Sequence, residues 1–329
     1  MGRCLPVLVF AVCLLSADSS ATVAQESQAL RLATLAPRGS KWMRVFEGWA
    51  ATLREETGGR LALRVEPGGP QVDDRALVRR MRSGRLDGAT LAASGLRDAV
   101  PAALVFAAPG LDPEGVGRAR SRLADELEAA FRERGYHLLG WVDLGQARLF
   151  SKGAPVRSPG DLREMKPWAR SDDAVFSALL AAAGARPVRA ELSQVRAALG
   201  GGRVDVVPAS ALTAVSTGWY TALDFVTKEP LWTMVGATVI RRASYTSLSD
   251  EERAALDRSG ARAHEVLQRV VEREERDALK TLTGRGIRLV PRRDARAWAS
   301  VASEARARMA GRVVPEALLR RVRQIAGAP

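Results

Sequence analysis

Apolar residues along the first hundred positions alternate between strand-like and helix-like spacing. The stretch 30–37, LRLATLAP, is typical of a buried strand, and 60–67, RLALRVEP, alternates like a second one. Between them, Ser40 is expected to cap a helix whose apolar residues recur at helical spacing. Another helical stretch leads into a third strand at 86–94. Strands that alternate with helices in this order predict a parallel sheet.

The same order returns in the middle of the chain. Residues 166–170 predict a strand, 172–202 two helices, and 203–210 another strand. The segments MRSGRLDGATLAAS and LGGGRVDVVPAS are alike, since each has a glycine-ended helix, then Gly-Arg-apolar-Asp, then an apolar strand that finishes at Ser94 or Ser210. This repeat indicates two similar α/β lobes, each presenting the carboxyl end of a strand, where such sheets bind ligands. Chance resemblance of two β-α units is the alternative.

A long segment without proline, 247–286, begins with a capping box between Ser249 and Glu252. A single helix of this length would measure about 50 Å, more than the roughly 30 Å of a small domain. We therefore expect it to cross both lobes. A break at Gly260 is one alternative, and a coiled coil is disfavoured because the apolar positions do not hold a heptad. The residues expected to face the core are Val266, Leu267, Val270 and Val271.

The length of the chain exceeds what one hydrophobic core usually holds, so we expect two lobes. Lobe I is predicted to comprise 25–145 and about 231–260. Lobe II is predicted to comprise 146–230 and about 261–329, with two C-terminal helices over 294–310 and 314–326.

The N-terminal residues 1–24 predict a secretory signal peptide. An apolar run from Leu5 to Leu15 follows a basic residue, and small and polar residues lead to Ala24, after which cleavage is expected. The run is shorter than the roughly 20 residues that span a bilayer, which argues against a membrane anchor. Lipidation at Cys13 is disfavoured because the preceding residue is not small. We therefore expect an exported, periplasmic protein.

The sequence offers little catalytic or metal-binding chemistry. Its two cysteines lie in the predicted signal peptide, so the mature chain would have no disulfide or thiolate site. His137 and His264 fit no ligand motif and are expected at surface or boundary positions, without a metal or cofactor. The acidic pairs Asp73-Asp74 and Asp172-Asp173 precede apolar helical runs, so helix capping is their better account. No nucleophile or phosphate-binding motif is present, which argues against an enzyme.

The net charge is +13, from 50 Lys plus Arg against 37 Asp plus Glu, and it raises the question of a nucleic-acid partner. However, only 5% of the residues are aromatic, and the arginines are spread along amphipathic helices. An arginine-rich solvated surface is the better account, so we expect no nucleic acid.

Five motifs occur in order between residues 29 and 245: ATLAPRGSKW, TGGRLALRVEPGG, MRSGRLDGA, SPGDLREMK and GRVDVVPASALTAVSTGWY. Together they resemble the solute-binding subunit of tripartite ATP-independent periplasmic (TRAP) transporters. The resemblance implies an α/β, two-lobed periplasmic-binding-protein-like fold, with a long helix spanning both lobes, that closes on a small-molecule ligand. It also implies a partner, an integral-membrane permease.

The resemblance also suggests where the ligand binds. Trp168 stands where ordinary members have an arginine that binds the substrate carboxylate, and Arg148 matches a second basic position. Arg170 lies two residues beyond Trp168, on the same face of a strand. Tryptophan here resembles a variant branch associated with tetratricopeptide-repeat partners and more apolar ligands, although that branch often has an aromatic residue in place of Arg170. Further candidates for the ligand site are Trp42, Ser94, Ser210 and Trp219, of which the two serines are expected on opposite walls.

We therefore expect a receptor for a small amphipathic or apolar organic acid, with Trp168 against the apolar part and Arg148 on the acid group. Two alternatives stay open. In the first, Arg148 and Arg170 bind an ordinary dicarboxylate. In the second, the same fold serves a sensory partner instead of a permease.

Overall fold

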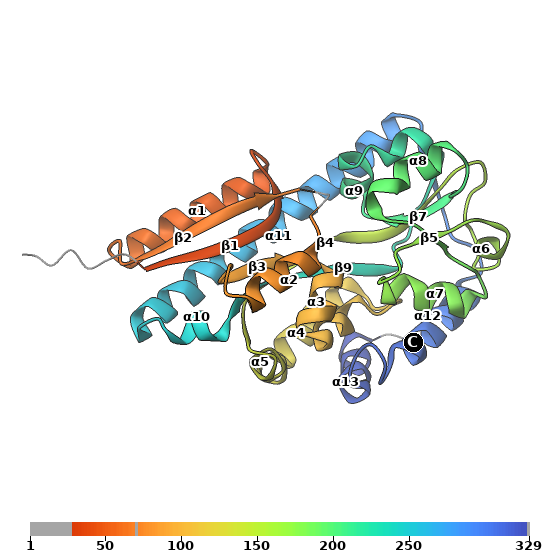
Figure 1. The fold of residues 1–329 in the computed structure, drawn as a ribbon. Helices are drawn as coiled ribbons and strands as arrows, with labels where there is room; N and C mark the ends of the chain where they lie inside the picture. The colour runs from red at the N-terminus through yellow and green to blue at the C-terminus, as the bar shows by residue number, and fades with distance from the viewer. Residues whose placement is uncertain (1–27, 70–71, 328–329) are drawn as a thin grey trace, which may run out of the picture.

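Two α/β lobes lie side by side and are joined by long strands and a long helix (Figure 1). The computed structural model describes residues 28–69 and 72–327. The predicted signal peptide, 1–24, lies outside the described residues. No helix in the described part of the chain combines the length and the apolar character that a membrane span requires.

Lobe I is built on a sheet whose first three strands are parallel, as predicted. β1 (Gln28–Pro37) lies between β2 (Leu61–Gly68) and β3 (Gly88–Leu91) and pairs with both. The helices that connect these strands are α1 (Lys41–Glu56), with Ser40 as its N-cap, and α2 (Asp74–Arg82), with Asp73 as its N-cap. The third strand is shorter than predicted because the chain turns into α3 (Ala93–Ala99) directly after it. Ser94 therefore lies in the first turn of a helix.

Two long strands, β4 (Tyr136–Ser151) and β9 (Trp232–Arg241), pair antiparallel and run from one lobe into the other (Figure 1). β9 also pairs antiparallel with β3, so the sheet is mixed and not wholly parallel. Two irregularities interrupt the register between β4 and β9, at Leu138/Gly140 and at Asp143/Gln146. The predicted lobe boundary at 145/146 falls inside β4, and the lobe limits stay a prediction because both strands belong to both lobes.

Lobe II surrounds the far end of β4. β7 (Val206–Ala209) and β8 (Phe225–Thr227) pair antiparallel with β4, and β10 (Arg288–Val290) pairs parallel with β8. β5 (Trp168–Ala169) and β6 (Val188–Arg189) form a short parallel pair, so the strand predicted over 166–170 is reduced to two residues. The helices of this lobe are α6 (Asp161–Glu164), α7 (Ala174–Ala183), α8 (Val195–Gly200) and α9 (Ala211–Ser216).

The predicted C-terminal helices are present as α12 (Ala295–Met309) and α13 (Glu316–Ala326). α12 packs against α7 of lobe II, whereas α13 packs against α4 (Pro113–Arg122) of lobe I. The C-terminal helices thus contact elements of both predicted lobes. Apart from one long helix, the remaining described helices are α5 (Ala124–Glu133), α10 (Arg242–Thr246) and the 3-10 helices η1 (Pro101–Ala107), η2 (Leu192–Gln194) and η3 (Trp219–Ala222).

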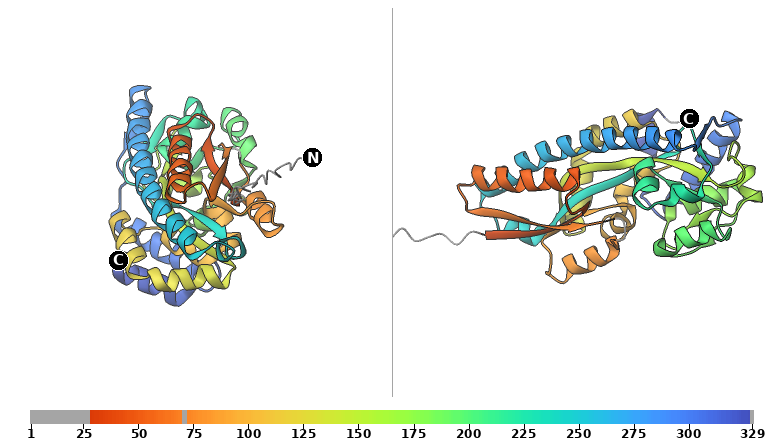
Figure 2. Two further views of the ribbon diagram at one scale, coloured as in Figure 1. Left: turned by 90° about the vertical axis from the view of Figure 1, so that its left-hand side faces the viewer. Right: turned by 90° about the horizontal axis from the view of Figure 1, so that it is seen from above.

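The long helix α11 (Asp250–Gly284) begins with the predicted capping box and continues unbroken through Gly260. It packs against α1 and β4 in lobe I and against α9 in lobe II, so it spans both lobes (Figure 2). The predicted core face is partly wrong, because Val266 is 41% exposed. The buried stripe follows the helical period from Gly260 through His264 and Leu267 to Val271, and Val266 lies beside it.

The prediction that His264 lies at the surface or its boundary is wrong. Its ring is buried against Phe46 and Trp49 of α1. Nδ1 lies 2.7 Å from the carbonyl oxygen of Gly260, and Nε2 lies 2.7 Å from the hydroxyl of Thr238 in β9. Burial lowers the pKa of His264 to about 4, so the ring is neutral at physiological pH. His264 therefore joins α11 to α1 and to a strand that links the lobes.

Candidate functional site

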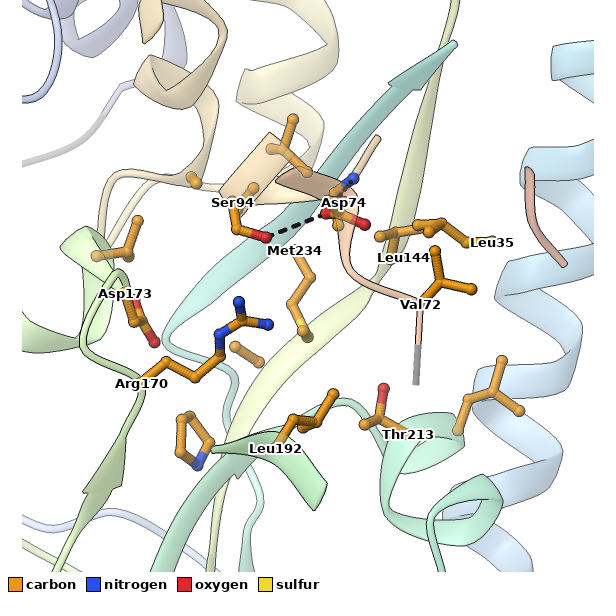
Figure 3. A pocket seen from close by; sticks show the side chains of 18 of the residues that line it. Leu35, Val72, Asp74, Ser94, Leu144, Arg170, Asp173, Leu192, Thr213 and Met234 are labelled. Atoms are coloured by element: carbon orange, nitrogen blue, oxygen red, sulfur yellow. Dashed lines mark hydrogen bonds between the residues drawn. The ribbon is translucent and has the colours of Figure 1, made fainter. Parts of the chain in front are cut away.

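A cavity of about 460 Å³ lies between the lobes (Figure 3). Its walls come from β1, α2, α3 and β9 on one side and from β5, α7, η2 and α9 on the other. Most of the side chains that line it are apolar. They include Leu35, Pro37, Val72, Leu104, Leu144, Val175, Leu192, Leu212, Met234 and Val235.

Three of the predicted aromatic and basic candidates, Trp168, Trp219 and Arg170, meet on the wall that lobe II contributes. The rings of Trp168 and Trp219 pack edge to face with their centroids 5.4 Å apart. The indole nitrogen of Trp168 donates to the carbonyl oxygen of Ala190 at 2.9 Å. Since that is the only donor of the side chain, Trp168 presents only apolar surface to the cavity.

Two further tryptophans, Trp42 and Trp232, also line the cavity. Trp42 was a candidate for the ligand site, whereas no motif in the sequence pointed to Trp232. Trp232 begins β9, one of the strands that run between the lobes, so its position on the cavity wall depends on how the lobes pack. Its ring packs against Phe176 of α7, with the centroids 5.8 Å apart.

Arg170 is held by the carboxylate of Asp172 through two parallel hydrogen bonds. Nε donates to Oδ1 and Nη2 donates to Oδ2, each at 2.9 Å. Burial works against the charge of Arg170, but the hydrogen bonds and charge of Asp172 outweigh it and raise the pKa of the guanidinium. Nη1 has no hydrogen-bond partner among the residues that the structure describes. Arg170 therefore has a fixed orientation and one edge open to a ligand.

Asp172 also contacts lobe I. Its main-chain carbonyl accepts a hydrogen bond from Nη1 of Arg97 in α3 at 2.8 Å, and its Oδ2 lies 4.0 Å from Nη1 of Arg75 in α2. These contacts cross the opening between the lobes. Asp172 thus connects the arginine on the wall of lobe II with the helices of lobe I.

Asp74 is a site residue, although its acidic pair was expected only to cap a helix. Asp73 is the N-cap, and Asp74, the next residue, is 4% exposed and lines the cavity. Its Oδ2 accepts hydrogen bonds from the main-chain nitrogens of Ala92 and Gly95 and from the hydroxyl of Ser94, at 3.0, 3.4 and 3.2 Å. Burial raises the pKa of Asp74 to about 6, although these bonds and the charge of Arg170 act in the opposite direction.

Asp74→Asn is expected to raise the free energy of unfolding near pH 7 and to change it little at pH 4. The folded protein keeps the proton of Asp74 up to about pH 6, whereas the unfolded chain loses it near pH 3.8. The wild-type protein therefore loses up to about 3 kcal/mol of stability as the pH rises between these values. Denaturant unfolding of both proteins at pH 4, 5, 6 and 7 measures the difference. A gap that does not widen with pH would contradict the expectation.

Two predicted ligand residues do not reach the cavity. Arg148 pairs with Ala209 of β7, and its guanidinium Nη1 donates to the carbonyl oxygens of Thr227 and Lys228. Burial lowers the pKa of Arg148 in spite of the charges of Glu275 and Glu229. Its side chain therefore satisfies main-chain oxygens in lobe II and does not stand on the cavity wall.

Ser210 is fully buried as the N-cap of α9, where its hydroxyl accepts from the main-chain nitrogen of Thr213 at 3.1 Å. The two serines of the internal repeat are therefore not on opposite walls. Only Ser94 lines the cavity, and it donates its hydroxyl hydrogen to Asp74. The carboxyl end of β7 turns directly into a helix, which uses the serine for capping.

The other charged side chains of the cavity have partners in the protein. Asp173 caps α7 by accepting from the main-chain nitrogen of Phe176 at 2.9 Å, as predicted for this acidic pair. Glu274 of α11 lies 3.7 Å from the ammonium group of Lys41. No group of three or more His, Cys, Asp or Glu side chains able to hold a metal ion occurs within residues 28–69 and 72–327. The geometry fits the binding of a small molecule between two lobes.

Solved structures of solute-binding proteins share this fold. A TRAP periplasmic solute-binding protein from Roseobacter denitrificans, with bound β-D-glucuronate, is 20% identical and has a TM-score of 0.80 over 92% of this chain and 100% of that chain. An extracytoplasmic solute receptor from Bordetella pertussis that binds pyroglutamic acid is 16% identical, with a TM-score of 0.79 over the same shares. A TRAP periplasmic solute-binding protein from Rhodobacter sphaeroides in an open, ligand-free form is 19% identical, with a TM-score of 0.80 over 91% and 98% of the chains.

These similarities confirm the two-lobed α/β fold. The sequence itself matches a family model over residues 32–312, which is most of the chain. The fold and this match agree on a solute-binding protein with two lobes. The chain belongs to the DctP family, the bacterial extracellular solute-binding proteins of family 7.

Proposed function

We propose that this protein is an extracytoplasmic receptor that delivers a small amphipathic organic acid to an ion-driven, TRAP-type membrane permease. The observation that carries the proposal is the cavity between the lobes, where mainly apolar walls surround the open edge of one arginine, Arg170. A planar guanidinium suits a carboxylate because two parallel hydrogen bonds can form. Ligands of relatives, such as glucuronate and pyroglutamic acid, are also small acids.

The apolar part of the ligand is inferred from the walls. Trp168 stands at the place where ordinary members have a carboxylate-binding arginine, and its only donor is bound to Ala190. Burial of apolar ligand surface contributes about 25 cal/mol of binding free energy for each Å² removed from water. A sugar acid with several hydroxyls would leave most of them unpaired against such walls, at a cost of about 1–3 kcal/mol for each buried group. An aliphatic or aromatic acid fits the walls better.

Octanoate is expected to bind at least about tenfold more tightly than succinate or glucuronate. Each methylene group that leaves water contributes about 0.8 kcal/mol, whereas a second carboxylate would face Asp74 without a cationic partner. Isothermal titration of the purified mature protein, stripped of any ligand that copurifies, measures the three affinities. Tight binding of succinate or glucuronate together with weak binding of octanoate would support the second candidate function.

That second candidate is an ordinary carboxylate receptor that uses Arg170 without Arg148. Arg170 on the cavity wall favours it, but Arg148 does not, because its guanidinium is bonded to main-chain oxygens. A sensory receptor with the same fold is a further hypothesis, and a permease gene beside the gene of this protein would argue against it. Native mass spectrometry of the purified protein would identify the molecule that it carries.

Partners and location follow from the family to different degrees. Membership implies export and a TRAP-type permease, and the family is one of solute-binding receptors. The tetratricopeptide-repeat partner depends on Trp168 alone and stays a prediction. The cleavage site after Ala24 also stays a prediction, which the mass of the protein purified from the periplasm would check.

Ligand binding is expected to close the lobes and so to reduce the radius of gyration. Arg97 and Arg75 of lobe I already reach Asp172 of lobe II across the opening, so the contacts of a closed form are available. Hinge closure is a common response of two-lobed receptors. Small-angle scattering with and without saturating octanoate measures the change. An unchanged radius of gyration, with binding verified by titration, would exclude hinge closure.

A further inference from the structure

We infer that the solute carries an ammonium group beside its carboxylate, and that Asp74 and Arg170 bind these two groups from opposite lobes. The inference rests on the proposed function and narrows it to apolar amino acids and related zwitterions. It assigns Asp74 as a specificity-determining residue of the receptor.

Asp74 and Arg170 face the cavity from different lobes. Asp74 comes from α2 of lobe I, is 4% exposed and lines the cavity. Figure 3 shows its carboxylate on one side of the cavity, with the guanidinium of Arg170 on the other. The two charges act on each other: the charge of Arg170 lowers the pKa of Asp74, and the charge of Asp74 raises the pKa of Arg170. No ion pair joins these two described residues directly, and both line the same cavity, where a ligand would lie between two opposite charges.

One carboxylate oxygen of Asp74 is unused. The three hydrogen bonds from Ala92, Ser94 and Gly95 all end on Oδ2. Oδ1 accepts none from the residues that the structure describes, and in Figure 3 it points away from Ser94. The side-chain oxygen of an asparagine could accept the same three hydrogen bonds, so these contacts with the start of α3 do not require a negative charge. A buried carboxylate without a directly paired cation is costly, and an ammonium group would supply that cation.

The charges around the cavity are not balanced. Four carboxylates line it, Asp74, Asp172, Asp173 and Glu274, against two guanidinium groups, Arg97 and Arg170. Asp172 is paired with Arg170, Glu274 with Lys41, and Asp173 caps a helix. Asp74 and Asp173 both lack an ion-pair partner among the described residues, and of these two Asp173 serves as the N-cap of α7. A simple anion would meet this excess of negative charge, whereas a zwitterion would not.

Three probes of matched shape test the inference: leucine, 4-methylpentanoate, which lacks the ammonium group, and 3-methylbutylamine, which lacks the carboxylate. The wild-type protein is expected to bind leucine at least about tenfold more tightly than either of the others at pH 7.5, a difference of about 1.4 kcal/mol or more. If 4-methylpentanoate binds as tightly as leucine, the inference is overturned while the proposed function stands. If neither acid binds and the amine does, both fail.

Asp74→Asn supplies the decisive variant. It keeps an acceptor for Ala92, Ser94 and Gly95 but removes the charge, so leucine is expected to lose about tenfold or more in affinity while 4-methylpentanoate loses none. Asp125→Asn is the control, because Asp125 is an exposed acid in the first turn of α5 and does not line the cavity. Its leucine affinity is expected to stay at the wild-type value. An equal loss for both acids in Asp74→Asn would indicate a merely structural role and overturn the inference.

Discussion

Arg170→Ala is expected to weaken the binding of every carboxylic acid by about 2–5 kcal/mol, because the ligand charge would lose its partner in a desolvated site. Arg170 is the guanidinium on the wall of lobe II, Asp172 fixes its orientation, and Nη1 is free of partners within the described residues. Titration with octanoate and succinate measures the loss. The exposed Arg186 of the same lobe offers a control, since Arg186→Ala removes equal charge away from the cavity.

Trp168→Ala is the companion variant and is expected to act on the apolar part of the ligand only. It should weaken octanoate binding by about 1–3 kcal/mol through lost apolar contact and leave succinate nearly unchanged. The sequence-based expectation was that Arg148, not Arg170, holds the acid group. If Arg170→Ala binds both acids like the wild type, the acid group binds elsewhere and Arg170 is not its partner. If Trp168→Ala binds octanoate with the wild-type affinity, the indole packs within lobe II and does not contact the ligand.

The order of strands and helices could be predicted because its signals are local. The N-cap residues Ser40 and Asp73 and the capping box of α11 act within one helical turn, and the structure shows all of them. Apolar spacing likewise predicted the parallel part of the sheet. The position of β9 between β3 and β4 could not be predicted, since it depends on pairing between residues far apart in the chain.

The site was predicted less completely, for reasons that differ between residues. Trp168 and Arg170 were found because they lie close in sequence and share a wall. The side to which the side chain of Arg148 points depends on the pleat of β4 after a register irregularity. No sequence pattern reveals this irregularity. Asp74 was missed because an acidic pair before a helix is fully explained by capping, although only Asp73 is the N-cap. The spacing of the residues does not show which acid of such a pair caps the helix and which one lines a cavity.

Gly140→Ala is expected to destabilise the protein by about 3 kcal/mol, the upper end for overpacking in a core. A methyl group at this position would lie 2.3 Å from Cγ and 2.6 Å from Nδ1 of the His264 ring. The ring cannot move aside easily, because both of its nitrogens lie at hydrogen-bond distance from fixed partners, the carbonyl of Gly260 and the hydroxyl of Thr238. Gly140 stands in β4 at a register irregularity, so the strand that links the lobes would be displaced from α11. Denaturant unfolding measures the loss.

Gly48→Ala is the matched control for Gly140→Ala. Gly48 lies within α1 with nothing within 4 Å of an added methyl group, so alanine there is expected to stabilise the helix by up to about 1 kcal/mol. The combined variant Gly140→Ala, His264→Ser tests the cause, because removing the ring leaves space for the methyl group. The two substitutions together should then destabilise less than the sum of the single losses, by about 1 kcal/mol or more. Simple additivity would show that the clash with His264 is not what makes glycine necessary where α11 crosses the strands between the lobes.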